Sequence, residues 1–142
     1  MTRNQNRTRP LAAALALVAA LAAAPAFAHQ CVDVDLLRAP DAARPGGVIL
    51  VEGSVTNCGE PARGFLITWW LVGDHGDRHL LRRAVSQVRP DQTLTGTVRL
   101  MIPVRIRPGV YDLVMLGEAP SGFTDSDAQR IAIRHPTRGP TR

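Results

Sequence analysis

The chain has 142 residues, of which 45% are hydrophobic and only 4% aromatic, and its 17 basic and 12 acidic side chains give a formal net charge of +5. This length suits one domain with its own core. Three of the basic residues, all of them arginines, lie before position 10, and without them the balance is 14 basic against 12 acidic residues. So small an excess argues against a nucleic-acid partner.

Residues 1–28 predict a secretory signal peptide. Three arginines precede an apolar run over residues 11–24, and Ala26-Phe27-Ala28 then supplies the small residues of a cleavage site. An apolar run of about 14 residues is too short to span a bilayer comfortably, although an uncleaved membrane anchor is the alternative. We expect a periplasmic or secreted protein that starts at His29 and has no membrane span after cleavage.

Residues 29–134 predict an immunoglobulin-like antiparallel β-sandwich of about seven strands. Short runs rich in Val, Ile, Leu and Thr alternate with polar residues, and Gly, Pro and Asp turns separate them at intervals of about ten residues. We expect a loop over 117–127 and a disordered tail over 135–142. The predicted strands cover residues 31–37, 48–57, 65–72, 80–87, 93–102, 110–116 and 128–134.

The two cysteines predict a disulfide between Cys31 and Cys58. The loop that it closes, of roughly 27 residues, corresponds to about 3–4 kcal/mol of stabilisation in the chain-entropy description. Antiparallel pairing of the first two strands places Cys31 opposite Cys58 and Val34 opposite Val55, so core residues face core residues. A metal or redox pair is the alternative, but the spacing is not that of a Cys-x-x-Cys motif.

Tyr111 follows a Pro108-Gly109 turn at the start of a predicted strand. This placement is typical of the tyrosine corner of Greek-key sandwiches, in which the hydroxyl bonds to backbone upstream. An ordinary strand tyrosine is the alternative.

Four motifs resemble, in order, those of the bacterial immunoglobulin-like domain called CARDB, the cell-adhesion-related domain found in bacteria. The resemblance spans about residues 33–133, most of the chain that follows the predicted signal peptide. The resemblance implies a binding or spacer module and carries no catalytic residues across. The family's acidic stretch is represented only by Glu118, Asp125 and Asp127, without its Asn pair. The motifs are Val55-Thr56-Asn57-Cys58-Gly59, Phe65-Leu66-Ile67-Thr68-Trp69-Trp70-Leu71, Val88-Arg89-Pro90-Asp91-Gln92-Thr93 and Pro108-Gly109-Val110-Tyr111-Asp112-Leu113.

Histidines provide the candidate metal ligands. Cleavage after Ala28 would give His29 a free α-amine beside its imidazole, and copper favours such nitrogen ligands. A second ligand would have to come from His75, His79 or His135. The cluster around His75 and His79 is also ordinary turn chemistry, with Gly and Asp between strands.

Trp70 is the candidate partner-binding residue. Adjacent tryptophans on a strand point to opposite faces, and Trp69 shares the apolar face, so Trp70 is expected on the outside with Arg82 and Arg83 nearby. An exposed tryptophan can anchor a protein or carbohydrate, whereas a packed outer sheet face is the alternative.

These patterns predict an exported, non-catalytic binding module without a required cofactor. Its expected partner is an exported protein or a cell-surface polymer, reached through Trp70 or by strand addition at an exposed sheet edge. No nucleophile elbow, phosphate-binding loop or buried carboxylate pair is evident. The alternatives are a periplasmic copper-binding protein that uses His29, and an accessory subunit or inhibitor of an exported enzyme.

Overall fold

The computed structural model describes residues 31–61 and 63–136; the predicted signal peptide, His29 and residues 137–142 lie outside this part. The described residues contain eight strands and no helix, and hence no helix able to cross a membrane. The short β2 is additional to the seven strands that the sequence predicts. The strands are β1 (Val32–Arg38), β2 (Ala42–Ala43), β3 (Val48–Asn57), β4 (Gly64–Gly73), β5 (Arg78–Gln87), β6 (Thr93–Met101), β7 (Gly109–Glu118) and β8 (Thr124–Ile133).

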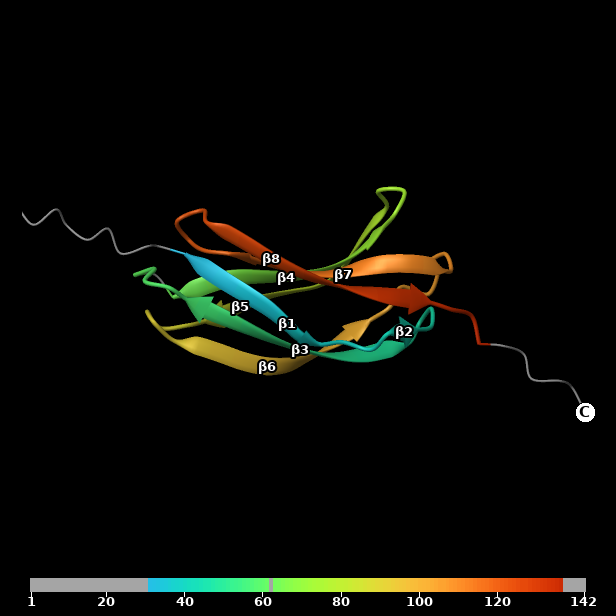
Figure 1. Cartoon of the computed structure of the whole chain (residues 1–142), viewed down its shortest axis with the longest axis horizontal. Coiled ribbons are helices and arrows are strands. Elements are labelled where there is room, and N and C mark those ends of the chain that lie inside the picture. Colours follow the sequence, from blue (N-terminus) through green and yellow to red (C-terminus); the bar gives the residue numbers. More distant parts are fainter. Residues whose placement is uncertain (1–30, 62, 137–142) are drawn as a thin grey trace, which may run out of the picture.

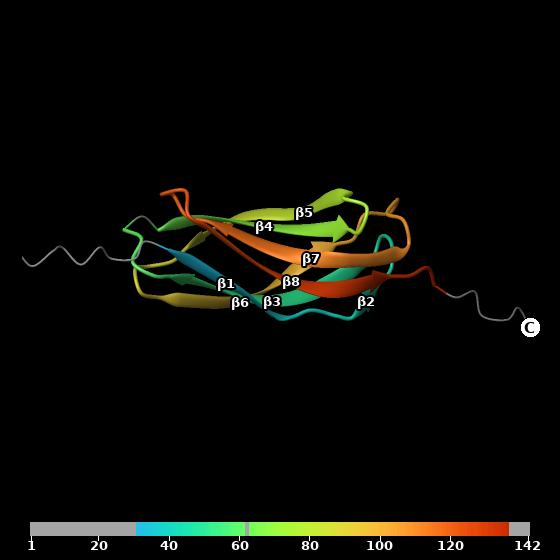
Figure 2. The ribbon, with the colours of Figure 1, turned by 45° about the horizontal axis from the view of Figure 1, so that its top comes forward.

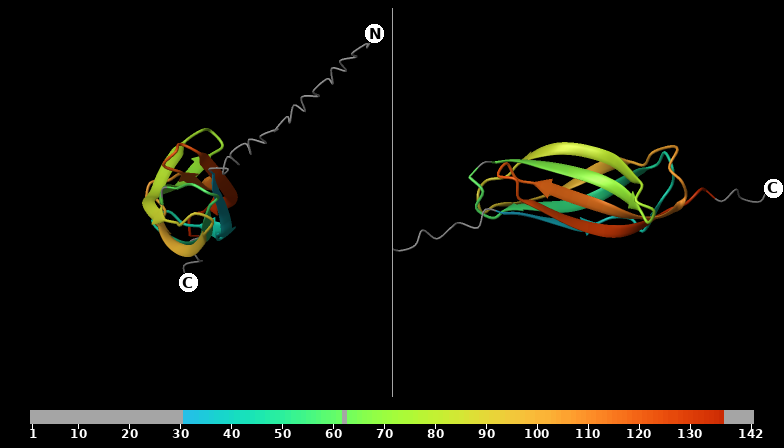
Figure 3. Two further views of the ribbon diagram at one scale, coloured as in Figure 1. Left: turned by 90° about the vertical axis from the view of Figure 1, so that its left-hand side faces the viewer. Right: turned by 90° about the horizontal axis from the view of Figure 1, so that it is seen from above.

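The strands form two sheets that face each other, which confirms an all-β sandwich (Figures 1 and 2). One sheet has the order β1-β3-β6 and the other the order β2-β8-β7-β4-β5. All neighbours are antiparallel except β2 and β8, which run parallel over two residue pairs. Seen along the long axis, the strands surround the interior (Figure 3, left).

The core lies between the sheets and consists mainly of alternate residues of β1, β3, β4, β7 and β8. On β4, for example, Phe65, Ile67 and Leu71 are completely buried, and so is Leu113 on β7. Burial of one such side chain stabilises the fold by about 1.5–3 kcal/mol, and the alternation of strand side chains makes the packing possible. Trp69 is buried in this core, as the sequence predicts.

The disulfide joins Cys31 and Cys58, whose Cα atoms are 5.0 Å apart. It links the residue that precedes β1 to the residue that follows β3, within the same sheet. Val34 pairs with Val55, as the alternation predicts. The register shifts after Leu36, so that Arg38 faces Glu52 and β1 carries one extra residue there. The predicted pairing is therefore confirmed up to this irregularity.

The prediction of a loop over residues 117–127 is wrong, because strands cover most of this range. β7 continues to Glu118, β8 already starts at Thr124, and a tight turn joins them, in which Ala119 N donates to Phe123 O at 2.8 Å. Gly122 has φ 93°, a backbone conformation that favours glycine. The first half of β8 is polar on both faces, so it lacks the apolar alternation on which strand prediction depends.

Those polar residues of β8 hold β1 in place. The Asp125 carboxylate accepts a hydrogen bond from Val34 N at 2.8 Å, and the Asp127 carboxylate accepts one from Leu36 N at 2.8 Å. Side chains thus connect the two sheets along the side where β1 meets β8, and we call this contact the β1/β8 seam. On the opposite side of the sandwich, β5 and β6 are the last strands of their sheets and do not pair.

Candidate partner-binding groove

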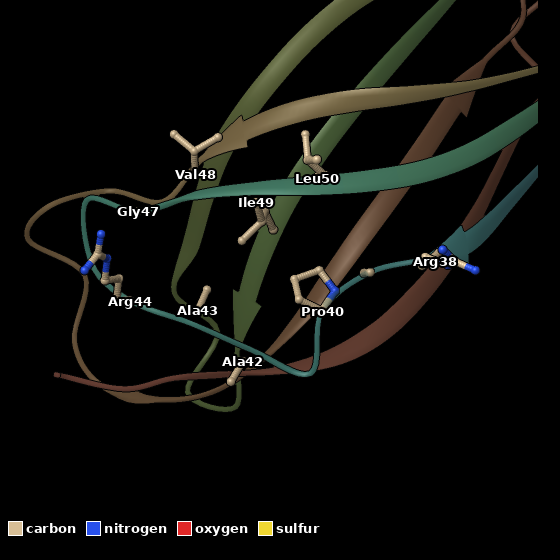
Figure 4. A pocket seen from close by; sticks show the side chains of 10 residues that line it. Arg38, Pro40, Ala42, Ala43, Arg44, Gly47, Val48, Ile49 and Leu50 are labelled. Atoms are coloured by element: carbon tan, nitrogen blue, oxygen red, sulfur yellow. The ribbon is translucent and has the colours of Figure 1, made fainter. Parts of the chain in front are cut away.

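A groove of ≈ 490 Å³ lies where the chain crosses from the three-stranded to the five-stranded sheet (Figure 4). One wall is the segment from Arg38 to Arg44, and the other is the start of β3. We call it the β3 edge groove. Its lining is mainly apolar and comprises Arg38, Ala39, Pro40, Ala42, Ala43, Arg44, Gly47, Val48, Ile49 and Leu50.

The first residues of β3 have a strand neighbour on one side only. β6 pairs with β3 along residues 48–56, whereas β1 leaves β3 after the pair of Arg38 with Glu52. The segment that follows β1 turns away to form β2 beside β8. Residues 48–51 therefore have an open edge that faces the β3 edge groove.

The hydrogen bonds of β3 identify the backbone groups at this edge. Asn57 N bonds to Gln92 O, next to β6, and Cys58 N bonds to Cys31 O, next to β1. Because the backbone groups of a strand alternate in direction and β3 keeps one register with β6 throughout, Val48 and Leu50 direct their N–H and C=O groups to the β1 side. Within the described residues, these groups have no strand partner.

Exposed apolar side chains gather at the same end of the three-stranded sheet. Val48 is 48% exposed, Leu50 61%, Met101 65% and Val104 75%. Val48 and Met101 are cross-strand partners, and Figure 4 shows Val48 and Leu50 on the same side of β3, with Ile49 on the other. We call these four residues the end patch. Contiguous exposed apolar side chains commonly mark an interaction site.

Positive charge flanks the groove at both ends. Arg38 and Arg44 are exposed, and within residues 31–61 and 63–136 neither makes a salt bridge. A segment with acidic side chains on either side of apolar ones would therefore complement the β3 edge groove in both charge and polarity.

Trp70 lies half-buried on the outer face of the five-stranded sheet. Its indole Nε1 donates to Thr68 Oγ1 at 2.9 Å on the same face. Arg83 faces Thr68 across the β4–β5 pair. Arg82 instead faces Trp69, and its Nη1 donates to Arg99 O on β6 at 3.3 Å. Of the two predicted arginines, only Arg83 is thus placed by the register on the Trp70 face.

His75 and His79 lie in a second, polar cleft of ≈ 700 Å³, which also includes Arg105, Arg107 and Tyr111. His79 Nε2 lies 3.3 Å from Asp77 Oδ2, and His75 is exposed at the tip of the turn. The described residues hold no group of three or more His, Cys, Asp or Glu side chains arranged to hold a metal ion. The copper hypothesis depends on His29, outside the described residues, and stays a prediction.

Tyr111 forms the predicted tyrosine corner at the edge of this cleft. Its hydroxyl donates to Arg107 O, four residues upstream, at 2.9 Å. Burial, with a smaller contribution from the nearby Asp77 carboxylate, raises the pKa of Tyr111 above its ordinary value. The phenol therefore stays protonated at neutral pH and remains a donor. We infer a structural role for this side chain.

The end patch was not predicted from the sequence. Val48 and Leu50 are apolar residues in a strand whose opposite face is also apolar, so alternation alone does not mark them as exposed. A usable signal was the unbroken apolar run Val48-Ile49-Leu50-Val51. In a sandwich, each sheet has one solvent-exposed face, so such a run must place some apolar side chains on that face.

Comparisons with known proteins indicate the fold alone. No family model matches the chain, and no curated protein sequence matches it. The sporulation control protein Spo0M from Bacillus subtilis superposes with a TM-score of 0.53 and 16% identity, over 75% of this chain and 49% of that one. A Niemann-Pick type C2 protein from Japanese carpenter ant gives a TM-score of 0.53 and 7% identity, over 72% and 89%.

A β-glucosidase from Listeria innocua, in complex with glucose, gives a TM-score of 0.51 and 13% identity over 72% of this chain. The aligned region is only 16% of the β-glucosidase, so the similarity concerns a small part of that enzyme. The three proteins differ in kind, and identities this low carry no activity from them to this chain.

Proposed function

We propose that this protein is an exported, non-catalytic binding module that holds an extended segment of a protein partner by strand addition in the β3 edge groove. The observation that carries the proposal is the open edge of residues 48–51 beside the exposed end patch. In strand addition, main-chain hydrogen bonds provide affinity, and pockets for alternate side chains provide specificity.

Export is part of the proposal. The basic, apolar and small-residue pattern of residues 1–28 supports it. The Cys31–Cys58 bridge supports it as well, because disulfides persist in oxidising compartments such as the periplasm and the extracellular space. The tyrosine corner and the sandwich fit an immunoglobulin-like domain of the CARDB kind.

The groove defines the chemistry of the partner segment. Val48 and Leu50 offer backbone donors and acceptors to an added strand, which would lie in line with β1. Every second side chain of that strand would meet the apolar wall formed by Pro40 and Ala43, and acidic residues at its ends would meet Arg38 and Arg44. If the partner is an exported enzyme, the module is its accessory subunit or inhibitor.

Site-specific photocrosslinking tests the proposal in the exporting cell. The photoreactive residue p-benzoylphenylalanine is placed at position 50 or 101 in the end patch, at position 70 on the other sheet, or at position 97. Thr97 is an exposed polar residue on the same strand as Met101 and serves as the control. We expect one adduct at positions 50 and 101, whose partner peptide is then identified by mass spectrometry.

A pair of substitutions separates strand addition from simple apolar contact. Leu50→Pro removes the edge N–H, which has no strand partner in the described part of the chain, whereas Leu50→Ala removes only the side chain. Strand addition requires that Leu50→Pro weaken binding of the identified peptide more than Leu50→Ala does, with both variants still folded by circular dichroism. Adducts at position 70 but not at 50 or 101 would instead assign the partner to the Trp70 face.

A further inference from the structure

A crevice of ≈ 170 Å³ opens between the two sheets on the side where β5 and β6 do not pair. Ile67, Trp69 and Met115, together with Ser86 on β5, form its wall on the five-stranded sheet. Val55, Leu94 and Val98 form its wall on the three-stranded sheet. This interior crevice is separate from the β3 edge groove and shares no lining residue with it.

Two paired glycines leave room between the sheets. Gly53 on β3 pairs with Gly96 on β6, so neither of these strands has a side chain at this point. A Cβ atom on Gly96 would meet no atom within 4 Å, because the space in front of it is open. A Cβ atom on Gly53 would lie 2.8 Å from Met115 Sδ, so the far wall comes close there.

Trp69, which lines the crevice, carries a hydrogen-bond donor that the described residues do not use. The residue is 4% exposed, and its indole Nε1 is the one buried side-chain nitrogen or oxygen atom of the described residues without a hydrogen-bond partner. Buried donors are normally paired in proteins. An acceptor brought into contact with this N–H would therefore gain a bond that the protein itself does not make.

We propose that the crevice is a binding site for a compact apolar molecule that carries one acceptor oxygen, a carbonyl or a carboxylate, which accepts a hydrogen bond from Trp69 Nε1. The volume is adequate, since an apolar protein cavity of about 150 Å³ is known to hold a benzene ring. The apolar walls of the crevice give the ligand its affinity, and the indole N–H orients its oxygen atom.

Entry of the ligand requires only side-chain movement. Trp69 Nε1 is covered, but Met115 is an unbranched thioether that adapts its shape readily, and Leu94 at the rim is 44% exposed. The Arg82 side chain donates to Arg99 O at 3.3 Å and so links β5 to β6 on the same side of the sandwich.

Nuclear magnetic resonance of the two indole N–H groups tests the site directly. The chain has two tryptophans, and Trp70→Phe assigns their indole signals. Titration uses acetophenone and isopropylbenzene, which are similar in size, but only acetophenone has a carbonyl oxygen. We expect saturable movement of the Trp69 signal with acetophenone, whereas the Trp70 indole, which is bonded to Thr68, stays in place as an internal reference.

Two variants make the result specific. Gly96→Leu should fill the crevice and abolish binding, while Thr97→Leu adds the same side chain to the neighbouring, outward-facing position as a control. Trp69→Phe keeps an aromatic wall but lacks the donor. The ratio of the Kd for isopropylbenzene to the Kd for acetophenone should therefore fall by about three- to tenfold in this variant. This is the factor that one net hydrogen bond contributes.

The proposal is overturned if acetophenone leaves the Trp69 signal unmoved, or if Gly96→Leu binds it as well as the unchanged protein. It is also overturned if Trp69→Phe retains the full preference for the ketone. If Trp69→Phe does not fold, the Gly96→Leu and Thr97→Leu pair decides the outcome by itself. None of these results bears on crosslinking at position 50, so the two proposals are tested separately.

Discussion

Asn57 uses its whole side chain to hold the end of β3 in place. Its Nδ2 donates to Glu60 O at 2.9 Å and to Val88 O at 3.1 Å, and its Oδ1 accepts from Gly59 N and Glu60 N. The side chain is completely buried. The Asn57 side chain thus provides hydrogen-bond partners for backbone groups of a turn that is not paired with any strand of the described residues.

Asn57→Ala should consequently lower the free energy of unfolding by about 2–4 kcal/mol, because it leaves several buried donors and acceptors unpaired. Urea denaturation at neutral pH measures the loss. Thr56→Ala, at the adjacent half-exposed position, is the control and should cost much less. Equal losses in the two variants would contradict the role assigned to Asn57.

Asp33 makes stability depend on pH. Desolvation raises the pKa of its carboxyl, and the neighbouring Asp35 and Asp125 carboxylates, together with a hydrogen bond to Asp125, raise it further. The folded state therefore holds the Asp33 proton more tightly than the unfolded state does, and stability falls as the pH rises through the carboxylate range.

Asp33→Asn removes this titration. We expect the variant to gain stability over the unchanged protein as the pH rises from about 4 to 7, with the unfolded carboxyl titrating near 3.9. Urea unfolding at several pH values measures the difference. A difference that is independent of pH would show that the charge of Asp33 is not responsible.

Among the strands, sequence periodicity was a good guide wherever one face is buried. The range of β3 was predicted without error, and its register with β1 followed from the alternation of Val34 and Val55. Periodicity failed at β2, a two-residue parallel contact of Ala42 and Ala43, and at the start of β8. In both places the strand is held by contacts that local apolar patterns do not encode.

The candidate sites also divide into features that local sequence patterns predict and features that they do not. The disulfide and the tyrosine corner follow from residue type and spacing, so the sequence predicted both. The β3 edge groove exists because β1 departs after Arg38, and the crevice exists because Gly53 meets Gly96 across two strands. Both depend on which strands become neighbours, and that information is not local in sequence.

The β1/β8 seam gives a prediction for the strands that it joins. Asp127→Ala leaves Leu36 N without its acceptor and should loosen β1 next to the shift in register. Hydrogen exchange should become faster at Leu36, while the amides of β4 in the middle of the other sheet remain protected. Faster exchange throughout both sheets would indicate general destabilisation instead.

At the scale of the whole molecule, the described chain begins and ends at opposite ends of the long axis (Figures 1 and 3). A stretching force on both ends acts along this axis. At Cys31 the force is transmitted through the disulfide to Cys58, so it bypasses the 27 residues of sequence separation between them.

Single-molecule stretching should show this difference. With the bridge intact, the extension on unfolding should be shorter by about 90 Å than after reduction, since each residue of extended chain contributes about 3.3–3.6 Å. Equal extensions before and after reduction would contradict this load path.

β1 and β3, including both walls of the β3 edge groove, lie inside the bridged loop and carry no tension along their backbone. A module anchored at both ends could therefore be placed under tension, as cell-surface proteins are in flow, without having the strand that holds its partner drawn out.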